Sequence, residues 1–383
     1  MRSAGPVGAA PRRGAALGRR SDPPIERVEA AAYTIPTDAP ESDGTLAWDS
    51  TTLVIAHARA GGVNGLGYSY THRSAADLIG TLLAPVVERR SAYAVSEAWY
   101  AMVQTVRNLG GAGIAATAIA AVDVALWDLK ARLMELPLAS LLGAVRPAVP
   151  IYGSGGFTSY DVRRLQQQLA GWVDTGITRV KMKVGREPAH DLERVRAARA
   201  AVGETTELFV DANGAYRRKQ ALRFAQAYAD EGVSWFEEPL VSEDLEGLRL
   251  LRDRAPAGMD IAAGEYGYEL IYFRRILEAG AVDVLQADAT RCLGITGFLQ
   301  ASVLCEAMQA PLSAHTAPAL HLHVGCACRP LLHVEYFHDH ARIESMLFDG
   351  AARPRDGELH PDLSRPGLGL ELRASDAEAY RVA

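Results

Sequence analysis

The stretch RVKMKVG, residues 179–185, places two lysines one residue apart within an otherwise apolar run. Apolar residues alternate with Lys181 and Lys183, which is the period of a β-strand. Because residues i and i+2 of a strand share one face, both ammonium groups point the same way. On a solvent-facing side this segment would be an ordinary amphipathic edge strand. In an enclosed site the two charges would lower each other's pKa and make a lysine usable as a base.

Short apolar runs alternate with stretches of helical length throughout the region after Pro147. The runs are VPIYGSG, RVKMKV, ELFVDAN, SWFEEP, DIAAGE, VDVLQAD, PLSAH and HVEYF. Runs that are apolar on both faces and joined by helices are typical of parallel strands buried on both sides. Eight in succession favour a barrel over an open sheet, so we predict an α/β fold with a TIM-type (β/α) barrel over 147–345. The region contains neither a dinucleotide-binding glycine fingerprint nor a phosphate loop.

The region 25–146 has a different order of elements, with strand-like runs first and helical patterns afterwards. The strand-like runs are IERVEAAAYTI, TTLVIAHARA and GLGYSYT. A polar, turn-rich segment, 36–50, separates the first two and is expected to be a loop. Helical patterns follow around 75–88, 95–109 and 113–134. This order predicts an α+β domain that ends where Gly143 and Pro147 stop the last helix.

The two ends of the chain are expected to lie outside these two domains. Residues 1–24 are rich in Ala, Gly, Arg and Pro and lack the apolar core of an export signal. We therefore expect a disordered tail there. The last segment, 346–383, is expected to return from the barrel to the capping domain.

The composition excludes several classes of protein. The 383 residues are 49% hydrophobic and 22% charged, with a formal net charge of −6. This charge gives no basic surface for nucleic acid or for anionic membranes, and no apolar stretch reaches the length of a membrane span.

The cysteines lie beside apolar neighbours, which predicts reduced, buried thiols in a cytoplasmic protein. They are Cys292, Cys305, Cys326 and Cys328.

Titratable residues close the successive apolar runs. They are Asp211, Glu237, Glu238, Glu265, Asp288 and His315, followed by Glu335 in the last run. Each run follows the previous one at the spacing of one βα unit, so each charge is expected at the C-terminal rim, where such barrels build their active sites. A single acid there is equally well explained as the N-cap of the next helix. Seven charged strand ends in succession, counting the lysine strand, are not. Carboxylates converging on one spot need a cation, and an all-oxygen set selects a hard ion such as Mg²⁺.

The order and spacing of these motifs resemble the mandelate racemase subgroup of the enolase superfamily. The motifs are KMKVG, VDANG, WFEEPL, AAGE, QADATRCLGITG, SAH and HVE. The stretch AAVDVALWDLKARLMELPLASLLG is similar to the last capping-domain helix and linker of that family. The resemblance covers nearly everything from Ile25 onward. It implies a modified (β/α)7β barrel with an N-terminal α+β capping domain and the active site at the strand ends.

The resemblance also implies a metal site and a base. Asp211, Glu237 and Glu265 would bind Mg²⁺. Lys183 would be a base on one face of the substrate, in keeping with the Lys or His bases of that superfamily. Lys181 would lower the pKa of Lys183 and help to hold the substrate carboxylate. The lysines would then face the barrel mouth rather than water.

A second group of residues would complete the site. His315, hydrogen-bonded to Asp288, would be the acid/base on the opposite face. Glu335 would donate a hydrogen bond to the substrate carboxylate. Asn213 would lie near the substrate, and Arg291 stands where another cation is common in the family.

Some features depart from the family pattern or stay outside it. Leu293-Gly294 replaces the usual pair of glycines, so the turn after the sixth strand is expected to differ. The triplet His338-Asp339-His340 follows the eighth strand and is interpreted as structural in preference to a second metal site. Trp127 is expected to be a core residue of the capping-domain helix.

These residues define the chemistry that the resemblance implies. The α-proton of a carboxylate is very weakly acidic, and its removal needs a cation and hydrogen-bond donors that stabilise the enediolate. Two bases on opposite faces then allow two outcomes. Return of a proton to the other face is racemisation or epimerisation. Loss of a β-hydroxyl group is dehydration.

The polar segment 36–50 favours dehydration. In this family a loop from this region closes over the substrate, and here Trp48 is its only large aromatic group among many hydroxyl and carboxyl side chains. That composition suits a polyhydroxylated substrate. We therefore predict that the small-molecule partner is a sugar acid, dehydrated to a 2-keto-3-deoxy acid. A racemase or epimerase of a 2-hydroxy acid and a non-catalytic ligand-binding barrel are the alternatives. A homo-oligomer is expected.

Overall fold

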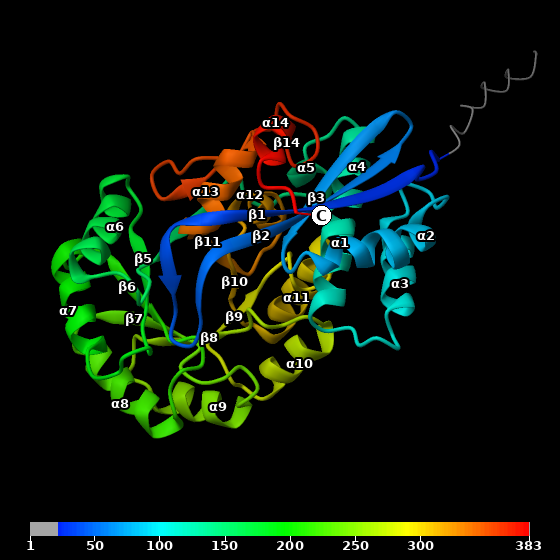
Figure 1. Cartoon of the computed structure of the whole chain (residues 1–383). Helices are drawn as coiled ribbons and strands as arrows, with labels where there is room; N and C mark the ends of the chain where they lie inside the picture. The colour runs from blue at the N-terminus through cyan, green and yellow to red at the C-terminus, as the bar shows by residue number, and fades with distance from the viewer. Residues whose placement is uncertain (1–21, 383) are drawn as a thin grey trace, which may run out of the picture.

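The structure, a computed structural model, describes residues 22–382. The tail predicted at 1–24 therefore lies outside the described residues, except for its last three. Within these three, the carbonyl oxygen of Pro23 accepts a hydrogen bond from the amide of Ala92, and Pro24 forms a β-bridge with Ser91. The rest of the described chain forms a cap, a barrel and a C-terminal segment (Figure 1).

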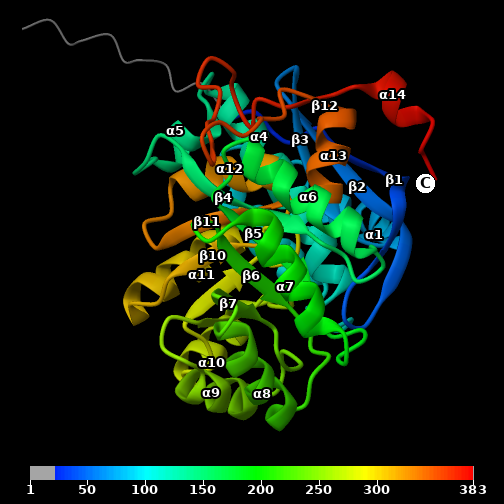
Figure 2. The ribbon, with the colours of Figure 1, turned by 90° about the vertical axis from the view of Figure 1, so that its left-hand side faces the viewer.

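Eight parallel strands form a closed barrel, because the first strand pairs with both the second and the last. The strands are β4 (Val149–Gly155), β5 (Arg179–Lys183), β6 (Glu207–Asp211), β7 (Val233–Glu237), β8 (Asp260–Ala263), β9 (Val284–Ala287), β10 (Leu312–Ala314) and β11 (Leu331–Phe337). The helices between them are α6 (Val162–Asp174), α7 (Asp191–Val202), α8 (Arg218–Ala229), α9 (Leu245–Arg254), α10 (Leu270–Glu278), α11 (Gly294–Met308) and α12 (Pro318–Cys326). Figure 2 shows the side where α6 and α7 cover the first strands. The predicted (β/α)7β barrel is confirmed.

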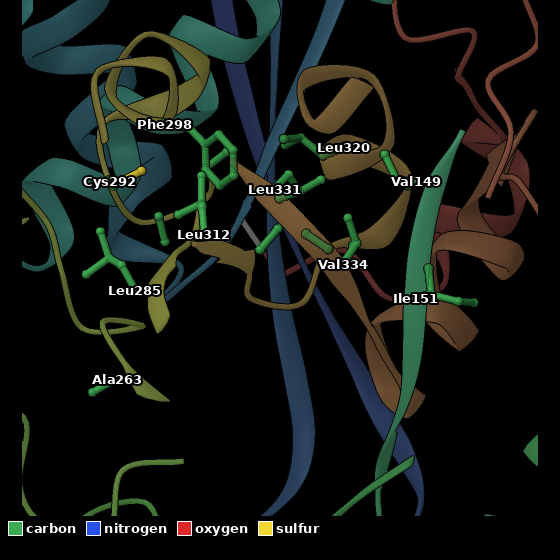
Figure 3. Packing of buried hydrophobic residues seen from close by; sticks show 14 of the residues in the cluster. Val149, Ile151, Ala263, Leu285, Cys292, Phe298, Leu312, Leu320, Leu331 and Val334 are labelled. Atoms are coloured by element: carbon green, nitrogen blue, oxygen red, sulfur yellow. The ribbon is translucent and has the colours of Figure 1, made fainter. Parts of the chain in front are cut away.

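The barrel strands are buried on both faces, which explains their near-continuous apolar sequences. One cluster fills the barrel interior and consists of Tyr152, Phe209, Trp235, Ala262 and Val284. On the outer side, Leu312 of β10 packs near Phe298 of α11 and Leu320 of α12 (Figure 3). The four cysteines are buried and unpaired, as predicted. Within residues 22–382, no helix is long and apolar enough to cross a membrane.

The cap consists of an antiparallel sheet covered by helices. Its strands are β1 (Arg27–Ser42), β2 (Ala47–Ala60) and β3 (Val63–Tyr70). Its helical segments are α1 (Ser74–Leu78), the π-helical η1 (Ile79–Leu83), α2 (Ala84–Val87), α3 (Val95–Thr105), α4 (Ile114–Leu133) and α5 (Leu138–Leu142). The alanine-rich α4 is almost wholly buried and packs against β3 on one side and α11 of the barrel on the other. Gly67 of β3 permits this approach, since a Cβ atom there would lie 2.2 Å from the carbonyl oxygen of Ala121.

The loop predicted at 36–50 is mostly strand, so that prediction is wrong. β1 continues to Ser42 and β2 begins at Ala47, with Glu41 paired to Trp48 after a register shift. The carboxylate of Asp43 closes the short turn by accepting hydrogen bonds from the amides that follow it. Polar composition suggested a loop, but cross-strand pairing and contacts with the barrel hold this hairpin extended. Its tip bends toward the barrel mouth (Figure 1).

The C-terminal segment runs from the barrel back to the cap sheet. It follows α13 (His338–Leu347) and contains β12 (Phe348–Asp349), β13 (Glu358–Leu359), β14 (Glu371–Leu372) and α14 (Ala374–Glu378). β13 adds to the barrel beside β4. Near the end of the chain, the amide of Val382 donates to the carbonyl of Ala32, and the amide of Thr34 donates to the carbonyl of Tyr380. Both contacts are made with β1.

Candidate active site

Strand register brings the first charged residues together at one rim of the barrel. Lys183 pairs with Asp211 across β5 and β6, and Asp211 pairs with Glu237 across β6 and β7. Adjacent strands lie about 4.8 Å apart, so these side chains meet. Glu265 and Asp288 follow the ends of β8 and β9 at the same rim.

Three of these carboxylates form a group that could hold a metal ion. One oxygen atom from each of Asp211, Glu237 and Glu265 lies within 4.8 Å of the other two, and all three residues are buried. The amide of Asn213 donates to Asp211 Oδ1 (2.9 Å), and the indole of Trp235 donates to Glu237 Oε2 (2.9 Å). Glu265 Oε2 is buried without a hydrogen-bond partner. An all-oxygen set with an unsatisfied buried oxygen fits a hard divalent cation such as Mg²⁺.

Acidic groups outnumber basic groups at this end of the barrel. The buried acids are Asp211, Glu237, Glu238, Glu265, Asp288 and Glu335. The lysine and arginine side chains in contact with them are Lys181, Lys183 and Arg291. The excess of carboxylates is a second reason to expect a cation here.

The two lysines lie inside the barrel and not in water. Lys181 is fully buried, with Nζ 2.5 Å from Glu237 Oε1 and 2.8 Å from Glu335 Oε1. Nζ of Lys183 lies 2.5 Å from Asp211 Oδ2. Lys183 lines the cavity at the barrel mouth, whereas Lys181 comes two residues earlier on the strand and lies among the carboxylates. The functional interpretation of the opening motif therefore fits the structure better than a solvent-exposed edge strand.

Lys181 lowers the pKa of Lys183 as expected, but it does not determine the net shift of that pKa. Burial lowers this pKa and the charge of Lys181 also lowers it, but Asp211, with Glu265 and Glu335, outweighs both. The net result is a pKa above the ordinary value for lysine. The repulsion between the charges of Lys181 and Lys183 therefore does not determine the protonation state of Lys183. A metal ion that binds the same carboxylates would weaken their effect on the lysine.

His315 and Asp288 form the hydrogen-bonded pair that the sequence predicts. His315 Nδ1 lies 2.9 Å from Asp288 Oδ2, and Asp288 Oδ1 accepts from the amide of Thr290 (2.7 Å). Burial raises the pKa of Asp288, but His315 and Arg291 outweigh it and bring the pKa below its ordinary value. The ionised carboxylate favours a proton on Nδ1 and leaves Nε2 for the substrate. That Nε2 atom lies 3.4 Å from Glu265 Oε2, beside the carboxylate group.

Glu335 is placed as a hydrogen-bond acceptor, which differs from the predicted donor role. Its Oε1 accepts from Ser154 Oγ (2.5 Å), and its Oε2 accepts from the amide of Thr316 (3.1 Å). Burial raises the pKa of Glu335, but Lys181 and His315 outweigh burial and bring it below the ordinary value. An ionised carboxylate has no proton to donate. Glu335 therefore forms an ion pair with Lys181 and accepts a hydrogen bond from the amide of Thr316, which follows His315.

Both predicted substrate-binding residues line the cavity. Arg291 Nη1 donates to the carbonyl oxygen of Glu265 (3.1 Å), and its guanidinium lies over the ring of Tyr266, 5.2 Å from the centroid. Asn213 has a buried Oδ1 atom without a partner. The cavity has a volume of about 560 Å³ and is shared by barrel and cap. The cap supplies a largely polar wall made of Asp43, Leu46, Trp48, Ser50, Thr51, Thr52, Tyr70, Thr71 and His72.

Four residues around the pocket were not predicted from the sequence. Thr316 places Oγ1 3.3 Å from Asp288 Oδ2, and His321 accepts a backbone amide hydrogen bond (2.9 Å) behind the same carboxylate. The rings of Tyr70 and His340 stack at the cavity wall with centroids 3.4 Å apart. The place of Thr316 directly after His315 was a usable signal. The other three come from a helix, from the cap and from α13, and no strand-end pattern marks them.

The turn at Leu293-Gly294 adopts left-handed backbone at both residues, with φ of 66° and 89°. Leu293 thus takes a conformation that favours glycine, where the family has one. Its carbonyl oxygen accepts a hydrogen bond from the indole of Trp99 (2.8 Å), which links the turn to the cap. Trp127 of α4 is partly buried and donates to Thr296 Oγ1 (2.9 Å) at the same interface.

Family models match both parts of the chain. The model for the N-terminal domain of mandelate racemase and muconate lactonizing enzyme matches residues 33–143, and the enolase C-terminal domain-like model matches residues 164–377. The chain belongs to the mandelate racemase/muconate lactonizing enzyme family. The resemblance predicted from the motifs is confirmed.

Two relatives of the chain carry the names of acid-sugar enzymes. The chain is 33% identical to a 3,6-anhydro-α-L-galactonate cycloisomerase of Streptomyces coelicolor, over 91% of this chain and 97% of the relative. It is 31% identical to an L-talarate/galactarate dehydratase of Salmonella typhimurium, over 91% and 89%.

Solved structures of the family superpose closely on this chain. A mandelate racemase/muconate lactonizing enzyme-like protein from Rubrobacter xylanophilus has a TM-score of 0.92 at 57% identity, over 94% of this chain and 99% of that one. An L-talarate dehydratase from Polaromonas, solved with Mg and L-glucarate, has a TM-score of 0.85 at 31% identity, over 94% and 98%.

Proposed function

We propose that this family member is a Mg²⁺-dependent dehydratase that converts a sugar acid into a 2-keto-3-deoxy acid. The observation that carries the proposal is the presence of two distinct proton-transfer groups at one cavity. Lys183 ends β5, and the His315–Asp288 pair follows β10 and β9. In the closed barrel, β5 is followed on one side by β4, β11 and β10, so that β10 is the third strand from β5. The two groups therefore approach a substrate from different sides.

Asp211, Glu237 and Glu265 would hold the Mg²⁺ ion. The ion would act as a Lewis acid on the substrate carboxylate and make its α-proton removable at neutral pH. Lys181 would keep Glu237 and Glu335 in place and add positive charge beneath the substrate carboxylate. Magnesium in the related L-talarate dehydratase supports the choice of metal.

The reaction would proceed by two proton transfers. Lys183, once neutral, removes the α-proton through Nζ. His315, as an imidazolium oriented by Asp288, then gives the Nε2 proton to the β-hydroxyl group, which leaves as water. The resulting enol tautomerises to the 2-keto-3-deoxy acid, so that one molecule of water is lost for each substrate. Asn213 and Arg291 would contact the substrate from the cavity wall.

The cap wall of the cavity supports a polyhydroxylated substrate. Hydroxyl-bearing side chains of the cap line the cavity, among them Ser50, Thr51, Thr52 and Tyr70. The named activities of the relatives, which are acid-sugar dehydratases and cycloisomerases, point the same way. We also propose that the protein is a homo-oligomer of the cytoplasm, as expected from the sequence.

The test is to incubate the purified protein and Mg²⁺ with a library of aldonic and aldaric acids. A 2-keto product detected by its semicarbazone and a mass lower by one water would support the proposal. An unchanged mass with inverted configuration would assign the protein as a racemase or epimerase, and an isomeric product without loss of water would assign it as a cycloisomerase.

The roles of the two proton-transfer groups are tested with the substrate so identified. Lys183→Met should abolish product formation, because methionine has no nitrogen atom that can take the α-proton. Lys219→Met on the outer helix α8 is a matched control and should keep the wild-type rate. Full activity of Lys183→Met would refute the assignment of the base.

A further inference from the structure

A second cluster of possible metal ligands lies where the cap meets the end of the barrel. It consists of Asp38 and Glu41 on β1 and of His338, the first residue of α13. One ligand atom from each of the three lies within 4.8 Å of the other two. His338 Nε2 is 3.1 Å from Asp38 Oδ2. β1 runs beside α13 at this point (Figure 1).

Glu41 provides an independent sign that something is bound here. The residue is only 1% exposed. Its Oε2 accepts a hydrogen bond from the indole of Trp48 (2.8 Å), but its Oε1 is buried without any partner. A buried polar atom left unpaired costs about 1–3 kcal/mol, so native proteins seldom leave one unsatisfied. A cation at the cluster would satisfy it.

The protein's own cations near the cluster do not fill this place. Arg342 forms an ion pair with Asp339 and donates to the carbonyl of Pro36 (2.7 Å). Arg164 approaches Asp38 at 3.4 Å, at the solvent-exposed side of the cluster. Neither forms a hydrogen bond or ion pair with Glu41 in the described part of the chain.

We propose that Asp38, Glu41 and His338 bind a divalent transition-metal ion of the Zn²⁺ class. One imidazole nitrogen and two carboxylate oxygens, with water in the open position, form a ligand set that zinc accepts. The imidazole favours such an ion over Mg²⁺ or Ca²⁺, which prefer oxygen ligands alone. This site is separate from the carboxylate group of Asp211, and it does not depend on the proposed dehydratase activity.

The ion would join the cap hairpin to the barrel. Its ligands come from β1 and from the start of α13, which are 297 or more residues apart in the chain. Glu41 also holds Trp48, whose side chain lines the active-site cavity. Binding would therefore fix the hairpin, 36–50, and one wall of the cavity.

The triplet 338–340 contributes one ligand and not three. Asp339 accepts from Thr51 and pairs with Arg342. His340 accepts from the amide of Ala317 (3.3 Å) and stacks on Tyr70. The interpretation of the triplet as structural, in preference to a second metal site, fits Asp339 and His340. The proposal departs from it at His338, whose neighbours Asp38 and Glu41 come from the cap.

The experiment is calorimetric titration of the full chain with Zn²⁺ in the presence of excess Mg²⁺, which occupies the carboxylate group. Wild type should bind Zn²⁺, and Glu41→Gln and His338→Ala should each weaken binding by about tenfold or more, as expected for the loss of one of three ligands. His190→Ala is the matched control, because His190 pairs with Glu187 at the surface (3.0 Å) without a third ligand. Circular dichroism would verify that each variant is folded.

Hydrogen exchange distinguishes this site from adventitious surface binding. Zn²⁺ should slow amide exchange in the segment 36–50 of wild type and leave it unchanged in His338→Ala. Equal Zn²⁺ affinity of wild type and His338→Ala would overturn the proposal, as would the absence of Zn²⁺ binding in wild type. In the latter case His338 and Asp38 form a hydrogen-bonded pair and nothing more.

Discussion

The Asp288→Asn variant tests the most specific feature of the site. In wild type the ionised Asp288 accepts from His315 Nδ1 (2.9 Å) and from the amide of Thr290 (2.7 Å). Asparagine keeps the shape and can retain the acceptor for Thr290. Its NH2 group would then face Nδ1, which disfavours a proton on that atom and therefore the imidazolium form.

The size of the effect follows from the bond that is lost. Asp288 and His315 are 1% and 5% exposed, so solvent screens their interaction little. A hydrogen bond to a charged group contributes about 1.5–3 kcal/mol. At about 1.4 kcal/mol per factor of ten, loss of the imidazolium should slow dehydration by about 10- to 150-fold.

The assay separates the two proton transfers. Release of keto acid measures dehydration, and deuterium uptake at the α-carbon in D2O measures proton removal by Lys183. Dehydration should fall by the factor above, while deuterium uptake should change less than threefold or so, because Lys183 keeps its contacts.

Two results would refute this reasoning. One is an unchanged dehydration rate in Asp288→Asn, and the other is an equal loss of dehydration and deuterium uptake. Asp123→Asn is the control, since Asp123 is a fully buried aspartate of α4 that bonds Thr296 outside the cavity. It should leave both rates near those of wild type.

Three further predictions concern the metal and the frame of the site. Removal of divalent cations with EDTA should abolish activity and Mg²⁺ should restore it, and full activity of metal-free enzyme would exclude the metal site. Gly264→Ala should destabilise the fold by about 2–5 kcal/mol in urea unfolding, because φ is +135° and a Cβ atom would lie 2.1 Å from the carbonyl oxygen of Gln286. Gly171→Ala in α6, with nothing within 4 Å, should instead stabilise by about 0.5–1 kcal/mol. Burial raises the pKa of Glu344 to about 8. The stability that its proton provides should therefore be complete at acid pH and be lost by up to about 1.4 kcal/mol per pH unit as pH rises toward 8, whereas Glu344→Gln should lack that slope in unfolding curves measured at several pH values.

The alternation of apolar runs with helical stretches predicted the barrel correctly, and the spacing of charges predicted that they lie at one rim. Repeated apolar runs with helices between them permit few arrangements, and a closed parallel barrel places every strand's C-terminal end at one rim. For that reason the spacing predicted that carboxylates from successive strand ends meet, and the resemblance to the family singled out Asp211, Glu237 and Glu265 among them. Their convergence required only that consecutive strands be neighbours.

The protonation states and the cap could not be predicted in this way. The pKa of Lys183 depends on distances to carboxylates from several strands, and these distances outweigh the effect of its neighbour in sequence. Glu335 was expected to donate a hydrogen bond, but the cations packed around it hold it ionised.

The sequence by itself determined the order of the elements, the family and the charged rim, because these depend on local periodicity and on spacing of one βα unit. The tertiary structure alone decided what meets across long separations. It extended the polar hairpin, 36–50, over the cavity and brought Asp38 and Glu41 to His338. Such contacts depend on how the cap packs on the barrel. Side-chain packing between distant segments does not produce a periodic pattern in the sequence, so it cannot be predicted from periodicity.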